Sequence, residues 1–109
     1  MGLVYAVGPN RQDCDSDSDF LSLVHAAAEN ISKACTEFNA TASDMGLPLI
    51  EILRVPLVSG GAFAGKCEKN DVAAALLRGI VSGAGPASPE FQFSFDGDVF
   101  RKTWIAMQI

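Results

Sequence analysis

The spacing of apolar residues changes along the chain between two periods. Residues 3 to 7 are continuously apolar and end at Gly8-Pro9, which predicts a strand buried on both faces. Between residues 17 and 38, apolar residues recur every three or four positions, which predicts an amphipathic helix. Its inward face is predicted to consist of Phe20, Val24, Ala27, Ile31, Ala34 and Phe38. Residues 39 to 48 are then expected to form an exposed connection.

The second half of the chain repeats the alternation. Residues 49 to 55 predict a central strand, which ends near Pro56 because proline cannot donate a ladder hydrogen bond. Residues 68 to 82 carry a helical apolar face, and Gly83 is suited to end that helix. Residues 91 to 95 alternate strictly between aromatic and polar side chains, which predicts a strand covered on one face.

A last helix is expected to begin at Asp96 or Asp98, with Phe100, Trp104 and Met107 as its inward stripe. Strands and helices therefore alternate along one domain that spans residues 1–109. Such alternation predicts the α/β class, with a small mixed or parallel sheet in a three-layer α/β/α arrangement. Ligands of such sheets bind beyond the carboxyl ends of the strands.

Charge and cysteine content restrict the function. The net charge of −5 and the pI of about 4.6 argue against a nucleic-acid partner or an anionic membrane partner. Cys14, Cys35 and Cys67 have no metal-like spacing, which indicates reduced thiols in an intracellular, cytoplasmic protein. No bound metal and no cofactor are expected.

An acidic run precedes the long helix. Its four aspartates alternate from Asp13 to Asp19, but a calcium loop would need glycine and glutamate where Ser18 and Val24 stand. The run is therefore interpreted as an acidic helix start, with Ser16 or Ser18 as its cap. His25, the only histidine, has no cysteine or acid at ligand spacing and is interpreted as a boundary residue.

The strongest candidate site is the loop after the central strand, Ser59 to Gly65. Glycines at 60, 61 and 65 permit positive φ and let a ligand approach the backbone. The helix that follows has unpaired N–H groups in its first turn, where anions bind. The loop is therefore predicted to form a nest of amide groups for a pyrophosphate.

Two interpretations of this loop compete. Gly60 and Gly65-Lys66 fit the nucleotide-binding P-loop, but Cys67 stands where a hydroxyl should reach magnesium. A thiol is a poor ligand for that hard cation. Degenerate P-loop nucleotide binding through Lys66 is therefore the weaker alternative.

A second interpretation covers nearly the whole chain. Three stretches resemble motifs of the macro domain family in their order and spacing. They are the motif from Val4 to Pro9, the strand and loop from Val55 to Phe63, and the turn from Phe95 to Asp98. The resemblance covers the C-terminal part of that fold, so the domain would be truncated at its N-terminus. The family's acidic adenine-binding residue and its Asn-containing loop have no counterpart in this sequence.

The resemblance implies binding of ADP-ribose or of an ADP-ribosylated protein. By position it implies ligand contacts at Ser59, Gly60, Gly61, Ala62, Phe63 and Phe95. Backbone amides of the loop would wrap the diphosphate, Phe63 would pack on the distal ribose, and Phe95 would lie beside the adenine. In the alternative, Phe63 fixes the loop and Phe95 is ordinary core.

Catalysis is expected to be inefficient, because the family's hydrolysis of ADP-ribosyl or ADP-ribose phosphate groups depends on the missing loop. No catalytic residue is therefore assigned. The missing strands would leave a sheet edge open, so a homo-oligomer or a complementing chain is expected to cover it. The remaining alternative is an assembly half-domain whose loop binds no ligand.

Overall fold

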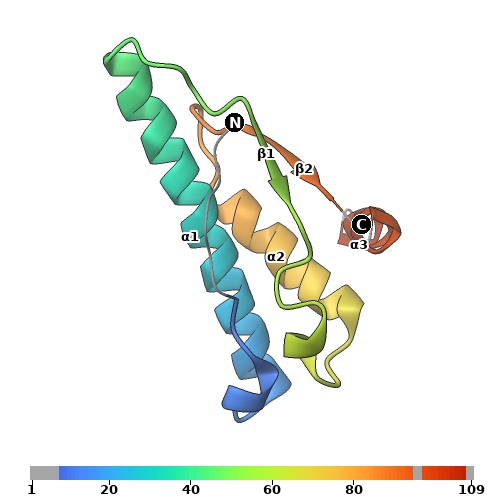
Figure 1. Cartoon of the computed structure of the whole chain (residues 1–109). Coiled ribbons are helices and arrows are strands. Elements are labelled where there is room, and N and C mark those ends of the chain that lie inside the picture. The colour runs from blue at the N-terminus through green and yellow to red at the C-terminus, as the bar shows by residue number, and fades with distance from the viewer. Residues whose placement is uncertain (1–7, 95–96, 108–109) are drawn as a thin grey trace.

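The computed structural model describes residues 8–94 and 97–107, and it has the expected mixed α/β class. In chain order the helices and strands are α1 (Asp17–Asp44), β1 (Ile52–Val55), α2 (Lys69–Gly83), β2 (Glu90–Phe93) and α3 (Gly97–Met107). Two short 3-10 turns, η1 (Arg11–Asp13) and η2 (Ala62–Ala64), precede α1 and α2. In Figure 1, α2 lies between the long α1 and the shorter α3, so α2 is the central helix.

The strands form a two-stranded parallel sheet joined by α2. Ile52 pairs with Glu90 and Val55 with Phe93 at the two ends of the register. Both strands are shorter than predicted, and the strand predicted at residues 3–7 lies outside the described residues. The parallel pair is confirmed as part of the predicted sheet. No helix among the described residues has the length and apolarity to cross a membrane.

The start of α1 follows the predicted signals, whereas its end does not. Ser16 is the N-cap, and its hydroxyl accepts a hydrogen bond of 3.1 Å from the Asp19 N–H. The helix then continues past the predicted end at residue 38 and stops at Asp44, before Gly46 with φ 67°. The exposed connection predicted from residue 39 is therefore wrong over its first half.

The extension of α1 is held by a buried asparagine. Asn39 is 3% exposed, accepts a hydrogen bond of 2.7 Å from the Ile50 N–H, and donates to the carbonyls of Ile50 and Ala87 at 2.9 Å each. One side chain thus joins α1 to the segments that lead into β1 and β2. Because its polar atoms have partners in other segments, Asn39 stays helical where the sequence suggests a break.

Small residues let α1 and α2 approach closely. A Cβ atom at Gly79 would meet the His25 carbonyl and lie 2.6 Å from the Ala28 Cβ. At Gly83 it would lie 2.5 Å from the Glu29 carbonyl oxygen. The predicted inward face of α1 is confirmed at Phe20 and Val24 and is wrong from Ala27 onward, because the buried positions are Phe20, Val24, Ala28, Ser32, Cys35, Asn39 and Ala42. Gly83 is the last residue of α2 and has no left-handed φ, so glycine is needed there for the close contact with α1 and not for the backbone conformation of a helix end.

Helix α3 packs on the sheet and on α2 through its first turns. The rings of Phe93 and Phe100 lie 4.8 Å apart, and Thr103 is buried one turn further along α3. Successive helical residues are about 100° apart around the axis. Trp104 is therefore rotated away from Thr103, and it is 43% exposed. The prediction that Trp104 faces inward is wrong, while that for Phe100 is confirmed.

Candidate functional site

The predicted phosphate loop is a compact turn that uses part of its own amide groups. The Gly60 N–H donates to the Leu57 carbonyl at 3.0 Å, and the Ala64 N–H donates to the Gly61 carbonyl at 3.1 Å. A Cβ atom at Gly60 would collide with the Leu57 side chain, so this glycine is required by packing. Two of the amides of the predicted nest are therefore already satisfied within the loop.

Ser59 adopts a left-handed backbone conformation in this loop, with φ 61°. This conformation is uncommon for a residue with a Cβ atom. Its hydroxyl donates a hydrogen bond of 2.7 Å to the Pro9 carbonyl, so the side chain ties the loop to the segment before η1. The Ser59 side chain therefore has a structural contact within the chain.

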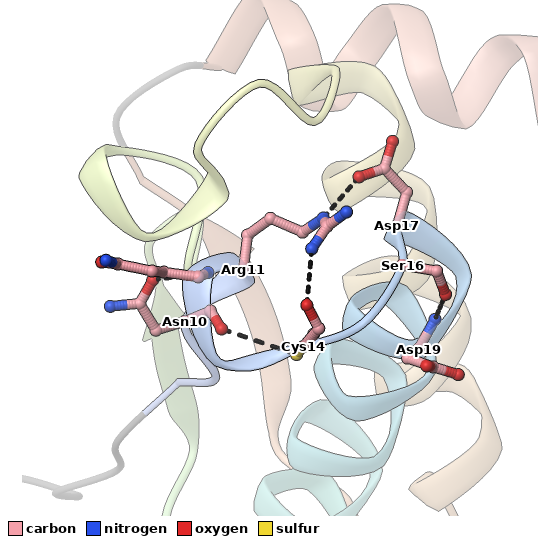
Figure 2. A network of polar contacts seen from close by, with 7 residues as sticks. Asn10, Arg11, Cys14, Ser16, Asp17 and Asp19 are labelled. Atoms are coloured by element: carbon pink, nitrogen blue, oxygen red, sulfur yellow. Dashed lines mark hydrogen bonds and ion pairs between the residues drawn. The ribbon is translucent and has the colours of Figure 1, made fainter.

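The arginine that lies beside this loop, Arg11, already forms an ion pair with an acidic residue. The Arg11 Nε atom donates to the Asp17 carboxylate at 2.6 Å, and its Nη1 atom donates to the Cys14 carbonyl at 2.8 Å (Figure 2). The hydrogen bond to Asp17 raises the pKa of Arg11. Arg11 lies next to Gly65, but its charge is engaged by the start of α1.

The P-loop interpretation also lacks chemical support at its last position. Cys67 is buried, and burial raises the pKa of its thiol, with a further rise from the charges of Asp17 and Asp71. The thiol is therefore held in its protonated form, which binds metal ions poorly.

The residues predicted to contact a ligand differ in their exposure, and the structure does not describe all of them. Phe63 is 44% exposed, and a Cβ atom at Gly61 would meet nothing within 4 Å, so both residues lie at the open surface of the loop. Phe95 lies outside the described residues. The role of Ser59, Gly60, Gly61, Ala62 and Phe63 as ligand contacts stays a prediction.

A second candidate site consists of three adjoining clefts beside α3. One of about 410 Å³ is lined by His25, Arg78, Val81, Ser82, Trp104 and Met107. A cleft of about 390 Å³ is lined by Leu77, Phe93, Gly97, Phe100, Arg101 and Trp104. A third of about 290 Å³ is lined by Asn70, Asp71, Ala74, Arg78, Lys102, Thr103, Ala106 and Met107. Trp104 is shared by the first two clefts, and Arg78 by the first and third. We call this surface the α2–α3 face.

Two of the three arginine and lysine residues that line the α2–α3 face have no partner among the described residues. Arg78 and Lys102 are exposed, and no hydrogen bond or ion pair engages either of them in the part of the chain that the structure describes. By contrast, Lys33 is paired with Glu29 at 3.1 Å, and Arg101 with Asp98 at 3.1 Å. The face therefore presents two unengaged positive charges beside an exposed indole.

These residues were missed because each was interpreted alone. Trp104 was predicted to belong to the inward stripe of the last helix, and Arg78 and Lys102 were not predicted as site residues. The adjacent pair Arg101-Lys102, followed two positions later by tryptophan, is the sequence signal that could have found the face. Basic residues interleaved with an aromatic residue are typical of surfaces that bind phosphates and bases.

Two curated proteins are similar to this chain over almost its whole length. DNA/RNA-binding protein ALBA4 of Plasmodium yoelii yoelii is 37% identical over 110 aligned positions, which cover 96% of this chain. DNA/RNA-binding protein ALBA4 of Plasmodium falciparum (isolate 3D7) is 34% identical with the same coverage. The chain spans 29% of the length of each of these relatives. No family model matches the chain, and no solved structure matches it.

These relatives overturn the macro domain resemblance. The proteins that match 96% of the chain carry the name of a DNA/RNA-binding protein. The predicted binding of ADP-ribose or ADP-ribosylated proteins, and the hydrolase-like character, are therefore wrong. The shared phrases around the glycine-rich loop were too short to identify a family, because small residues are needed there for turns and for the packing of Leu57.

The expectation that nucleic acid is excluded is also wrong, as the names of the same relatives indicate. The physical reason is that net charge is a sum over the chain, whereas phosphate contacts are local. Four of the 13 acidic residues stand between Asp13 and Asp19, before and within the first turn of α1. Their charge lowers the total without lying among the residues that line the three clefts of the α2–α3 face.

Proposed function

We propose that this chain is a segment of an Alba-family protein and that it binds DNA or RNA. The observation that carries the proposal is the similarity to the two DNA/RNA-binding proteins over 96% of the chain. The α2–α3 face supports it, because Arg78 and Lys102 offer positive charge that no acid engages among the described residues.

The charge distribution sets the expected strength of binding. Affinity for nucleic acid depends mainly on the number of phosphates that the protein neutralises. Two unengaged cations and Arg101, which shares its charge with Asp98, allow only a few phosphate contacts. We therefore expect a Kd of about 10⁻⁴–10⁻⁶ M for this chain alone, the range of sequence-independent binding.

Fluorescence anisotropy with labelled DNA and RNA oligonucleotides tests the proposal. Binding should weaken between about 50 mM and about 200 mM salt, because bound phosphates release counterions. Each of Arg78→Gln and Lys102→Gln should make the slope of log K against log salt shallower by about 0.7–0.9. Lys33→Gln is the matched control, since it removes the same charge from a lysine already paired with Glu29.

If Lys33→Gln weakens binding as much as the other two substitutions, net charge rather than the α2–α3 face determines affinity. If neither DNA nor RNA binds more tightly than about 10⁻³ M at the lower salt concentration, which is weaker than ordinary sequence-independent binding, the proposed function is wrong for this chain.

The finer architecture is part of this proposal. The three-layer α/β/α arrangement of a single domain over residues 1–109 stays a prediction, now without a macro-like identity. A two-stranded sheet is rarely stable alone, which supports a wider sheet in the complete domain.

A further inference from the structure

We infer that the α2–α3 face binds single-stranded nucleic acid, with a base stacked on the Trp104 indole and neighbouring phosphates on Arg78 and Lys102. This inference rests on the proposed function and names the class of nucleic acid and the residues that contact it. Nothing in the names of the relatives distinguishes single strands from duplexes or assigns residues.

The first step of the argument is the exposure of the indole. Trp104 is 43% exposed, although it neighbours the buried Thr103 and lines two clefts. An indole at the surface between two clefts offers a ligand both an apolar ring face and a polar N–H group. The cleft it shares with Leu77, Phe93 and Phe100 is mainly apolar and suits the face of a planar ring.

The second step is the placement of charge around this ring. Arg78 lines one cleft with Trp104 and another with Lys102. Because Lys102 and Trp104 are about 200° apart around the axis of α3, they lie on opposite flanks of that helix, and Arg78 of α2 is the residue that their clefts share. Arg101 lines the apolar cleft together with Trp104. A strand whose base stacks on the indole would therefore meet a cation in each of the two clefts that Trp104 lines, Arg78 in one and Arg101 in the other, and could reach Lys102 through the cleft of Arg78.

The third step distinguishes single strands from duplexes. Base faces are covered by stacking within a duplex, and they become available to an aromatic side chain only when the strand is single or the base is unstacked. Duplex recognition through the major groove needs an element that enters the groove with several base-contacting side chains. The α2–α3 face instead offers one aromatic ring flanked by cations, which is the composition of single-strand sites.

Asp71 and Asp98 oppose this interaction and limit its strength. Asp71 lines the cleft that contains Arg78 and Lys102, and Asp98 is paired with Arg101 at 3.1 Å. Substituting either aspartate with asparagine should therefore strengthen binding of single strands. Stacking on Trp104 is then needed to favour a single strand at a face with so few cations.

The intrinsic fluorescence of the protein provides the test, because Trp104 is its only tryptophan. Titration with a single-stranded oligonucleotide should quench that fluorescence, and a duplex of equal length should bind more weakly and quench less. Anisotropy of labelled single strands should show a loss of about tenfold in affinity for Trp104→Ala, within the range that base stacking gives on alanine substitution. Trp104→Phe should restore most of that loss.

Phe38→Ala is the matched control, because Phe38 is an aromatic residue of α1 with 52% exposure and it lines none of the three clefts. Its affinity should equal that of the unaltered protein, and circular dichroism should show all three variants folded. If duplex and single strand bind equally, or if Trp104→Ala binds normally, the inference is wrong while the proposed function stands. If no nucleic acid binds at all, both are wrong.

Discussion

At the scale of single residues, buried polar side chains distinguish structural positions from functional ones. Asn39, Ser32 and Thr103 are all buried, but only the first two have hydrogen-bond partners among the described residues. The Ser32 hydroxyl donates to the Ile80 carbonyl at 2.8 Å, and Asn39 uses its donors and its acceptor. The cost of substitution should therefore differ in sign between these positions.

We expect Asn39→Ala to lower the free energy of unfolding by about 1–3 kcal/mol, since it leaves partly buried backbone groups of Ile50 and Ala87 without their side-chain partner. Urea denaturation followed by circular dichroism measures the change. Asn30→Ala, at an exposed position of the same helix, is the control and should be within about 0.5 kcal/mol of the unaltered protein. Equal stability of the two variants would contradict the prediction.

Thr103→Val should have the opposite effect. The Thr103 hydroxyl has no partner in residues 8–94 and 97–107, and valine has nearly the same shape. Removing an unpaired buried hydroxyl should leave the free energy of unfolding unchanged or raise it by up to about 1–2 kcal/mol. The same denaturation experiment would show a clear decrease if the hydroxyl had a partner that the described residues do not provide.

At the scale of elements, the contact between α1 and α2 depends on residues that lack side-chain volume. Gly79 faces Ala28, and Gly83 faces Ser32, at positions where a Cβ atom would meet the backbone of α1. In an isolated helix, alanine in place of glycine is favourable by about 1 kcal/mol. Packing therefore overrides helix propensity at both positions.

We expect Gly79→Ala to lower the free energy of unfolding by about 1–3 kcal/mol, because the added methyl group forces α1 and α2 apart. Gly61→Ala is a suitable control, since a Cβ atom there has no neighbour within 4 Å. Thermal denaturation of the two variants provides the comparison. An increase in stability for Gly79→Ala would show that the helices are less closely packed than described.

The elements themselves were largely predictable from the sequence, and their packing was not. Apolar periodicity identified α2 to within a residue at each end, and Ser16 was one of the two predicted caps. The buried face of α1 was predicted at Ala27 and Phe38, because large apolar residues attract the inward assignment. The buried face lies at Ala28 and Asn39 instead. Ala28 is buried because only a small residue fits against Gly79 of α2, and Asn39 is buried because its side-chain amide donates to the carbonyls of Ile50 and Ala87.

The candidate site was predictable only in part, for a related reason. The glycine-rich loop was conspicuous in the sequence, whereas the α2–α3 face joins residues from three helices that no single motif contains. Trp104 departed from its predicted inward position because the buried direction of α3 is fixed by Phe100 and Thr103. Net charge, as an average over all residues, could not indicate where cations gather.

At the scale of the whole molecule, ligand binding and folding should be coupled through α3. This helix contacts the rest of the fold through α2 and through the ring of Phe93, and the proposed ligand would bridge α2 and α3. A ligand that binds only the folded state stabilises it by about 2.7 kcal/mol at a concentration of 100 Kd.

We therefore expect a saturating single-stranded oligonucleotide to raise the Tm by about 10 °C or more, given roughly 4–8 °C per kcal/mol for a domain of this size. Differential scanning fluorimetry with an external dye measures the shift. Trp104→Ala should keep nearly the Tm of the free protein and lose about half of the increase, because a tenfold weaker Kd lowers the stabilisation at the same ligand concentration to about 1.4 kcal/mol. A shift of equal size in Trp104→Ala would place the ligand elsewhere on the molecule.

The three cysteines have different accessibility, and this gives the protein a set of internal reporters. Cys14 is half-buried beside η1, whereas Cys35 and Cys67 are buried, and burial raises the pKa of both of those thiols. A raised pKa means less thiolate near neutral pH, so both thiols should be alkylated more slowly than Cys14. The alkylation rate of Cys35 would then follow the transient exposure of the buried face of α1, and that of Cys67 the opening of the turn before α2. Mass spectrometry of partly alkylated protein could thus follow local opening in solution without any introduced label.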